Sequence, residues 1–306
     1  MGRIITNSRH NMMNKLVGVA VIGLGAIAAG YFGYTKYYAG AQPNFSDVAY
    51  SEVSTRNVAD IYLPEGATNA PLVISIHGGG FKLGDKSNAP GVAALVEAGY
   101  AVAAINYQLS DTTQWPGQLD DLKSALKFLR ENAKTYGYNG EKIGSMGASA
   151  GGHLSSMMGI ALSDDPVTRV QASVDWFGPI LFDKMDEDIE ATGVERATGR
   201  NDAADSPESI LIGATVGESA ELVWAASPLS FLEAANTDNI PPFLVMHGQK
   251  DTFIGAGQSQ RLVDGLVEKG VSAELVLLPE GTHGGGDFDN TSTMQAVVKF
   301  FDQHLK

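Results

Sequence analysis

The stretch KIGSMGASAGGHL, residues 142–154, decides the fold of this chain. Residues 142–146 read as a short strand, and a helical pattern begins after Gly151. Between them lies a G-x-S-x-G sequence centred on Ser149, in the strand–turn–helix context that the motif requires. Glycine on both sides avoids a collision in so sharp a turn and leaves the hydroxyl exposed. A glycine-rich turn that holds a serine by chance is the alternative, but the flanking strand and helix make Ser149 the predicted nucleophile.

The rest of the chain alternates short β-branched runs with helical patterns, which is typical of a mostly parallel sheet flanked by helices. Strands are predicted at residues 71–76, 100–106, 142–146, 170–176, 242–247 and 273–278. Helices are predicted at residues 118–136, 151–162, 258–269 and 293–304. An acidic stretch at residues 183–222 fits neither period. We expect a small insertion there, near the site, which is either a solvated loop with helical turns or a cap over a binding pocket.

Length and composition limit the possible functions. The chain has 306 residues, enough for a single domain with one large hydrophobic core. Its net charge is -14 and its sequence pI is about 4.8, so a phosphate backbone is repelled and nucleic acid is not expected as a partner. The sequence contains no cysteine, which excludes disulfides, thiolate metal sites and a cysteine nucleophile. We expect no metal and no cofactor.

The first forty residues differ from the rest. Basic residues precede an apolar run at residues 16–34, and no acidic residue occurs before Asp47. This pattern predicts an export signal or a membrane anchor, with an A-x-A cleavage pattern at residues 39–41. We therefore expect residues 1–41 to be a signal peptide or anchor and residues 42–306 to be an exported catalytic domain, periplasmic or extracellular. It would meet a membrane only through an uncleaved segment. A buried helix of the domain is the alternative.

A second glycine motif, HGGGF at residues 77–81, follows the predicted strand at residues 71–76. A glycine-rich turn at this place can point bare amide groups into the space above a nucleophile. The N–H groups of Gly79, Gly80 and Ala150 are therefore the candidate oxyanion hole, in which one donor is worth about 3 to 4 kcal/mol. A phosphate-cradling loop is the alternative, which the lack of a G-K-[ST] sequence makes weak.

A serine nucleophile needs an adjacent base, and the chain has six histidines. His283 is the candidate because it follows a late strand in a glycine-rich loop, residues 281–286, from which it can reach back over Ser149. The other five lie in the targeting segment, the glycine turn, two helices and the end of a buried strand: His10, His77, His153, His304 and His247.

The base in turn needs an acid, which fixes its tautomer and stabilises the imidazolium. Asp251 comes directly after the predicted strand at residues 242–247, and so at the same carboxyl edge of the sheet as Ser149. The chain order Ser, Asp, His is also that of the α/β-hydrolase fold. Asp287 and Glu280, which flank His283, are the alternatives.

With these residues in place, the chain resembles the acetyl xylan and feruloyl esterase-like (BD-FAE-like) branch of the α/β-hydrolases, related to the hormone-sensitive-lipase-like esterases. The resemblance covers residues 48–306 and rests on IHGGGF (76–81), GASAGGHL (147–154), DWFGP (175–179), PPFLVMHGQKD (241–251) and the histidine loop. It implies an α/β-hydrolase fold and a serine esterase acting on acetylated or feruloylated sugars or small esters. Its triad would be Ser149, Asp251 and His283.

Two positions depart from similar esterases. Gln108 stands where an arginine is common, so a structural ion pair is expected to be missing. Ala148 stands before the nucleophile where the hormone-sensitive-lipase-like group usually has aspartate, which favours the xylan-esterase-like branch. Pocket shape depends on several loops, and we predict that Phe81, Tyr107 and Trp176 contact the substrate.

Three functions are compatible with these motifs. Ester hydrolysis through an acyl-enzyme is the favoured one. Amide or peptide hydrolysis by the same triad must protonate a poor leaving group and usually requires an added gating domain. A non-catalytic binding module would have no reason to keep the whole triad and the oxyanion glycines.

Overall fold

The structure of the protein is a computed structural model that describes residues 41–306. The predicted export segment at residues 16–34 lies outside the described residues. Within residues 41–306, no helix is both long enough and apolar enough to cross a bilayer.

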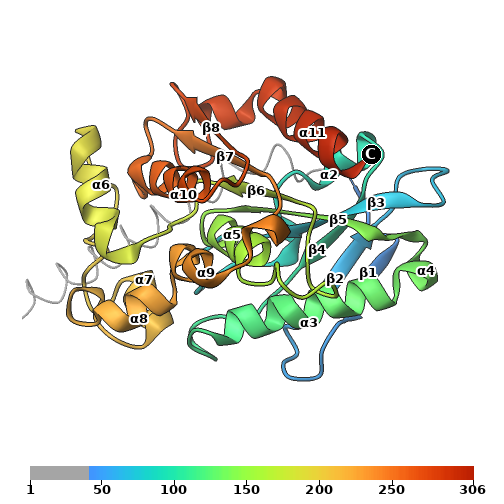
Figure 1. The fold of residues 1–306 in the computed structure, drawn as a ribbon, viewed down its shortest axis with the longest axis horizontal. Coiled ribbons are helices and arrows are strands. Elements are labelled where there is room, and N and C mark those ends of the chain that lie inside the picture. The colour runs from blue at the N-terminus through green and yellow to red at the C-terminus, as the bar shows by residue number, and fades with distance from the viewer. Residues whose placement is uncertain (1–40) are drawn as a thin grey trace, which may run out of the picture.

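The fold is built on an eight-stranded sheet with the order β1-β2-β4-β3-β5-β6-β7-β8 (Figure 1). Strands β3 to β8 are parallel to one another, and β2 pairs antiparallel with both β1 and β4. This confirms the predicted mostly parallel sheet. The strands are β1 (Phe45–Ala49), β2 (Val58–Tyr62), β3 (Ala70–Ile76), β4 (Ala101–Ile105), β5 (Tyr138–Ala148), β6 (Ala172–Trp176), β7 (Phe243–Gly248) and β8 (Ala273–Leu278).

Helices cover both faces of this sheet. Successive side chains of a strand point to opposite faces, so Leu72 and Ile74 of β3 pack in one layer of the core and Val73 in the other. Helices α3, α5 and α10 cover one face, and α2 and α11 cover the other (Figure 1). Their bounds are α2 (Val92–Glu97), α3 (Gly117–Glu131), α5 (Ala150–Ile160), α10 (Gly257–Glu268) and α11 (Thr291–Leu305).

All six predicted strands are present, and so are the four predicted helices, the first of them divided into α3 and the short α4 (Ala133–Tyr136). The antiparallel edge was not predicted. Most of β1 is exposed, and its pairing with β2 shifts register between Phe45 and Val48. A strand with almost no buried face lacks the alternation by which strands are recognised in a sequence.

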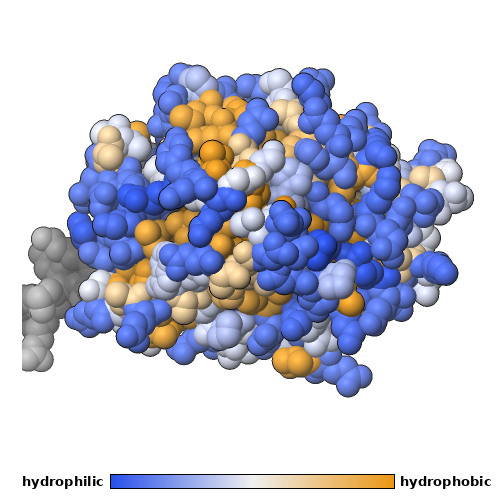
Figure 2. All heavy atoms as spheres, viewed as in Figure 1, coloured by the Kyte–Doolittle hydropathy of each residue, from blue (hydrophilic) through white to orange (hydrophobic). Residues whose placement is uncertain are grey.

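The acidic stretch folds into short helices: α6 (Met185–Thr192), α7 (Pro207–Ile212) and α8 (Ala220–Ala225), at the left of Figure 1. The insertion thus consists of short helices joined by loops, as expected for a segment with helical turns, and its role as a cap stays a prediction. Asp188 of α6 accepts hydrogen bonds from Gln258 at 2.6 Å and from Arg261 at 2.8 and 2.9 Å. Both donors belong to α10, so the insertion is fastened to the helix layer. Figure 2 shows apolar areas between the mainly hydrophilic residues on this side of the molecule.

Candidate active site

Ser149 lies in the sharp turn between β5 and α5. Its backbone has φ 56° and ψ -123°, a conformation that non-glycine residues rarely adopt. A Cβ at Gly147 would lie 1.9 Å from the carbonyl oxygen of Gly151, and one at Gly151 would lie 2.1 Å from that of Ile76. Only glycine fits at either position, which is the physical reason for the motif. The Ser149 N–H donates to the Trp176 carbonyl at 2.9 Å and fixes the turn to β6.

The structure brings Ser149, His283 and Asp251 together in a hydrogen-bonded chain. His283 Nε2 lies 3.0 Å from Ser149 Oγ, and His283 Nδ1 lies 2.7 Å from Asp251 Oδ2. The three residues come from the β5–α5 turn, the loop after β8 and the loop after β7, all at the carboxyl ends of parallel strands. This is the geometry by which a histidine deprotonates a serine while a carboxylate orients the ring.

Asp251 is buried but well supplied with hydrogen bonds. Its Oδ1 accepts the N–H groups of Phe253 at 2.8 Å and Ile254 at 3.0 Å. Burial by itself would raise the pKa of Asp251, but the imidazoles of His283 and His247 outweigh it and hold this pKa below the ordinary aspartate range. Asp251 therefore stays ionised, as an orienting carboxylate must.

The two alternative acids have other partners. Asp287 Oδ2 accepts the Glu280 N–H at 2.7 Å, and its Oδ1 accepts from the Asn290 side chain at 3.1 Å. Glu280 is exposed and forms an ion pair with Lys250. Asp287 thus shapes the histidine loop, and Asp251 is the residue bonded to the imidazole.

The predicted oxyanion loop lies against the nucleophile. A Cβ at Gly78 would be 2.8 Å from the Ala148 carbonyl oxygen and 3.3 Å from Ser149 Cβ. Gly79 and Gly80 have φ values of 117° and 59°, which L side chains rarely adopt. In the part of the chain that the structure describes, no hydrogen bond engages the N–H groups of Gly79, Gly80 or Ala150. These N–H groups are thus without a partner among the described residues, and their role as oxyanion donors stays a prediction.

The family can be identified once this geometry is known. The BD-FAE family model matches residues 59–266, a range that includes Ser149 and Asp251. This chain belongs to the BD-FAE family. His283 lies beyond the matched range, so its assignment rests on the hydrogen bonds described above.

Named relatives of this BD-FAE chain are esterases. Esterase LipQ of Mycobacterium tuberculosis is 27% identical over 82% of this chain and 59% of its own length. The probable carboxylic ester hydrolase LipM of the same organism is 29% identical over 76% of this chain and 54% of its own length. The chain therefore spans little more than half the length of these relatives.

Solved structures show the same fold. A truncated carbohydrate esterase from gut microbiota superimposes with a TM-score of 0.76 at 28% identity, over 86% of this chain and 96% of that chain. Esterase B from Lactobacillus rhamnosis superimposes with a TM-score of 0.72 at 21% identity, over 95% of this chain and 96% of that chain. These neighbours confirm the predicted α/β-hydrolase fold.

The three predicted substrate-binding side chains are placed in the core, which corrects that prediction. Phe81 and Tyr107 are 0% exposed and Trp176 is 2% exposed. Phe81 packs edge-on against His153 at 5.3 Å between ring centroids, and Tyr107 stacks on His77 at 4.5 Å. The sequence places each residue near a strand end but does not show which way its side chain points.

Two aromatic residues beside the base were not predicted. Phe177 and Phe253 both lie against the His283 imidazole, with ring centroids 4.7 and 5.0 Å away. The only signals in the sequence are their positions, since Phe177 directly follows β6 and Phe253 comes two residues after Asp251. Such contacts arise between segments far apart in the chain.

Gln108 forms hydrogen bonds at the position where similar esterases commonly carry an arginine. Its main-chain N–H and its side-chain amide donate to Asp121 at 2.7 and 3.1 Å. Arg56 donates to the neighbouring Tyr107 carbonyl at 2.9 Å and to Gly84 at 3.0 Å. The segment after β4 is thus held by the Asp121 carboxylate and the Arg56 guanidinium, without an ion pair at position 108.

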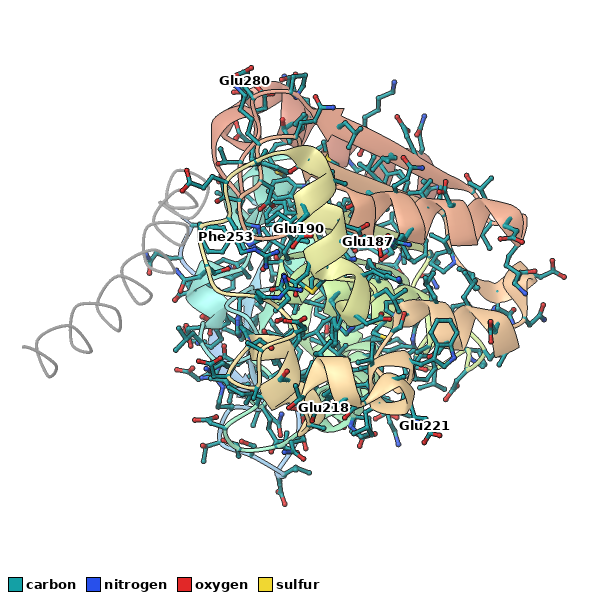
Figure 3. The ribbon with its side chains drawn as sticks, turned by 90° about the vertical axis from the view of Figure 1, so that its left-hand side faces the viewer. Glu187, Glu190, Glu218, Glu221, Phe253 and Glu280 are labelled. Atoms are coloured by element: carbon teal, nitrogen blue, oxygen red, sulfur yellow. The ribbon has the colours of Figure 1, made fainter. Side chains whose placement is uncertain are left out.

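Exposed carboxylates surround the approach to the insertion and the histidine loop. Figure 3 shows this face of the molecule with Glu187, Glu190, Glu218, Glu221 and Glu280, together with Phe253. Glu187 pairs with Lys184 and Arg261, and Glu190 with Arg196 and Arg200. Basic side chains thus pair with several of these carboxylates, although the whole chain carries a net charge of -14.

Proposed function

We propose that this chain is a serine carboxylesterase that hydrolyses acyl esters through an acyl-enzyme intermediate. The observation that carries the proposal is the hydrogen-bonded chain from Ser149 Oγ through His283 to Asp251, with distances of 3.0 and 2.7 Å. The esterase names of its relatives support the same reaction.

Acylation begins when Ser149 Oγ attacks the ester carbonyl carbon. The Oγ–H proton moves to His283 Nε2, and the imidazolium is stabilised by the Asp251 carboxylate. The carbonyl oxygen becomes an oxyanion, for which the N–H groups of Gly79, Gly80 and Ala150 are the proposed donors. The tetrahedral intermediate then breaks its bond to the alcohol oxygen, which takes the proton from His283 Nε2.

Deacylation repeats these steps with water in place of serine. His283 removes a proton from the water as its oxygen bonds to the acyl carbon. When the second tetrahedral intermediate collapses, the bond to Ser149 Oγ breaks and Oγ regains a proton from His283. The carboxylic acid leaves and the enzyme is restored.

The proposed substrates are small acyl esters, including acetylated or feruloylated sugars. The carbohydrate esterase among the structural neighbours supports a sugar as the alcohol. The net charge of -14 favours esters without a negative charge, because like charges repel an anionic substrate as it approaches. It also favours release of the carboxylate product.

A hydrolysis panel tests this proposal. Residues 42–306 are assayed on acetyl, butyryl and feruloyl esters of one sugar, and a fluorophosphonate probe reports covalent labelling of Ser149. We expect hydrolysis of at least one ester and labelling that Ser149→Ala abolishes. A well-folded protein that hydrolyses none of the esters and takes up no label would contradict an esterase function.

We also propose that residues 16–34 direct export, so that the catalytic domain acts outside the cytoplasm. The support is the basic residues before the apolar run and the A-x-A pattern after it. Fusion of residues 1–45 to a periplasmic reporter should export the reporter. A reporter retained in the cytoplasm would exclude this role.

A further inference from the structure

Two phenyl rings contact the imidazole of His283. Phe177 has its ring centroid 4.7 Å away with an interplanar angle of 56°, and Phe253 lies at 5.0 Å and 31°. Phe177 is buried, whereas Phe253 is half-buried and lies on the face that Figure 3 presents. The His283 side chain is 12% exposed. The two rings therefore shield much of the imidazole that must move the proton.

The hydrogen bonds to this imidazole do not fix it completely. Both lie near the ring plane, at Nδ1 and Nε2, so the ring can still tilt about the line that joins these atoms. The histidine loop contains four glycines, two of which, Gly284 and Gly286, have φ values of 85° and 65°. Contacts on the ring faces are what oppose such a tilt.

Main-chain conformation and main-chain hydrogen bonds fix the positions of Phe177 and Phe253. Phe177 has φ 43°, a left-handed value that costs a non-glycine residue about 1 to 3 kcal/mol and that clusters at functional sites. Its turn is held by the Phe177 N–H on the Met246 carbonyl at 2.9 Å and by the Gly178 N–H on Asp175 at 2.7 Å. Phe253 donates its own N–H to Asp251 Oδ1 at 2.8 Å. It thus contacts the acid through its main chain and the base through its ring.

We propose that Phe253, together with Phe177, is a positioning residue for His283, which keeps the imidazole aligned with Ser149 and Asp251 and stabilises the imidazolium. The inference rests on the proposed function. When the Ser149 O–H bond breaks and Oγ bonds to the acyl carbon, the proton arrives at Nε2 and the ring becomes a cation. The negative face of an aromatic ring attracts that cation. Leucine fills similar space without this attraction.

The groups that face the imidazole come from every neighbouring segment. Asp251 from the loop after β7 and Ser149 from the elbow bind its two nitrogens. His247 lies behind the acid, 3.5 Å from Asp251 Oδ2. Lys250 in the loop after β7 and Glu280 in the loop after β8 form an exposed ion pair. The substitutions below leave all of these groups in place.

The test replaces the ring and keeps its volume as far as possible. Phe253→Leu should lower kcat about five- to twentyfold with little change in KM, because the effect is on the charged state of the base. The acidic limb of the kcat/KM profile should shift about half a pH unit toward lower pH, because the protonated imidazole loses its stabilising ring. Phe253→Tyr should restore both. Thermal unfolding reports the stability of each variant.

Phe128→Leu is the matched control, since Phe128 is also half-buried but lies on α3 against Tyr136, 6.2 Å between centroids. It should leave the pH profile unchanged. If Phe253→Leu matched this control in kcat and in the acidic limb, or raised only KM, the positioning role would be wrong. Such a result with an active wild type would leave the esterase proposal intact, whereas an inactive wild type that the fluorophosphonate does not label would overturn the esterase proposal itself.

Discussion

Ser149 and His283 meet at one edge of the sheet, but they are held there by different means. Ser149 is held by the packing of the main chain in the turn between β5 and α5. A Cβ atom added at Gly147 or Gly151 would lie only 1.9 or 2.1 Å from a main-chain carbonyl oxygen, so no side chain fits at either position. His283 is held by side chains from other segments, namely Asp251, Phe177 and Phe253. The nucleophile is therefore placed by local structure and the base by tertiary structure.

This difference makes the two halves of the site vulnerable to different changes. Altering the nucleophile side should damage folding or abolish the chemistry outright, because no other arrangement of that turn is available. Altering the base side should leave the fold in place and reduce the rate by degrees, because several contacts share the task of holding one ring. The variants below separate these two cases.

The largest effect is expected at the nucleophile itself. Ser149→Ala should lower kcat by about 10⁴ to 10⁶-fold, because only the oxyanion donors and substrate binding remain. Circular dichroism and the unfolding midpoint should match the wild type, since the hydroxyl makes no contact that the fold requires. Ser124→Ala on α3 is the control. Turnover close to that of the wild type in Ser149→Ala would show that another residue is the nucleophile.

The acid should come next. Asp251→Asn should lower kcat by about 10³ to 10⁴-fold, because an amide at this position favours the wrong tautomer of His283. Asp287→Asn removes a charge from the same region while Asp251 keeps the imidazole, so its kcat should fall by less than about tenfold. Steady-state kinetics on one ester compare the two. A larger loss in Asp287→Asn would reverse the assignment of the acid.

Matched glycine substitutions test the comparison through stability. A Cβ at Gly147 meets the Gly151 main chain at 1.9 Å, whereas one at Gly285 meets only the Thr282 hydroxyl at 2.9 Å. Gly147→Ala should therefore lower the free energy of unfolding by at least about 3 kcal/mol, and Gly285→Ala by less than about 1 kcal/mol. Urea denaturation measures both. Equal losses would mean that the histidine loop is as tightly constrained as the elbow.

The same division decides what the sequence could predict. Ser149 and its glycines follow from short-range sterics, so the motif was sufficient. His283 and Asp251 followed from chain order and from the shared edge of a parallel sheet, which brings distant loops together. Phe177 and Phe253 carry no local pattern, because their contact with the base exists only in the folded chain.

The wrong predictions have the same origin. Tyr107 and Trp176 lie near the carboxyl ends of strands, where side chains alternate between the site and the core. A shift of one residue in that alternation separates the two outcomes. The insertion was recognised from its charge, but α6, α7 and α8 are too short to show a helical period.

Two buried carboxyl groups extend the comparison to electrostatics. Asp251, on the base side, is surrounded by two imidazoles, which hold its pKa below the ordinary range despite its burial. Glu208 of α7 lies on the nucleophile side, next to Pro207, which packs against Gly80 of the oxyanion loop. Among the described residues, Glu208 Oε2 has no hydrogen-bond partner. Burial accordingly raises the pKa of Glu208 to about 7.

The smallest expected effect is the pH dependence that Glu208 adds to stability. In the unfolded chain its carboxyl has an ordinary glutamate pKa, so between about pH 5 and pH 8 the folded state binds the extra proton. A group that binds more protons when folded loses its stabilising contribution as pH rises. The free energy of unfolding of the wild type should therefore fall relative to that of Glu208→Gln across this window, by up to about 3 kcal/mol.

Urea denaturation at pH 5 and at pH 8 measures this difference, and Glu218→Gln, an exposed glutamate on the same insertion, is the matched control. The free energy of unfolding of the control should follow that of the wild type at both pH values, because the Glu218 side chain is exposed to solvent. Asp251→Asn should instead lower the free energy of unfolding relative to the wild type. The Asp251 carboxylate contributes stability above the unfolded aspartate pKa, so this loss should be present at pH 8 and should shrink only in acid. If the free energies of unfolding of Glu208→Gln and Glu218→Gln depended on pH in the same way, the Glu208 carboxyl would be solvated or paired in the folded protein. The nucleophile side would then not be the water-free region that its packing indicates.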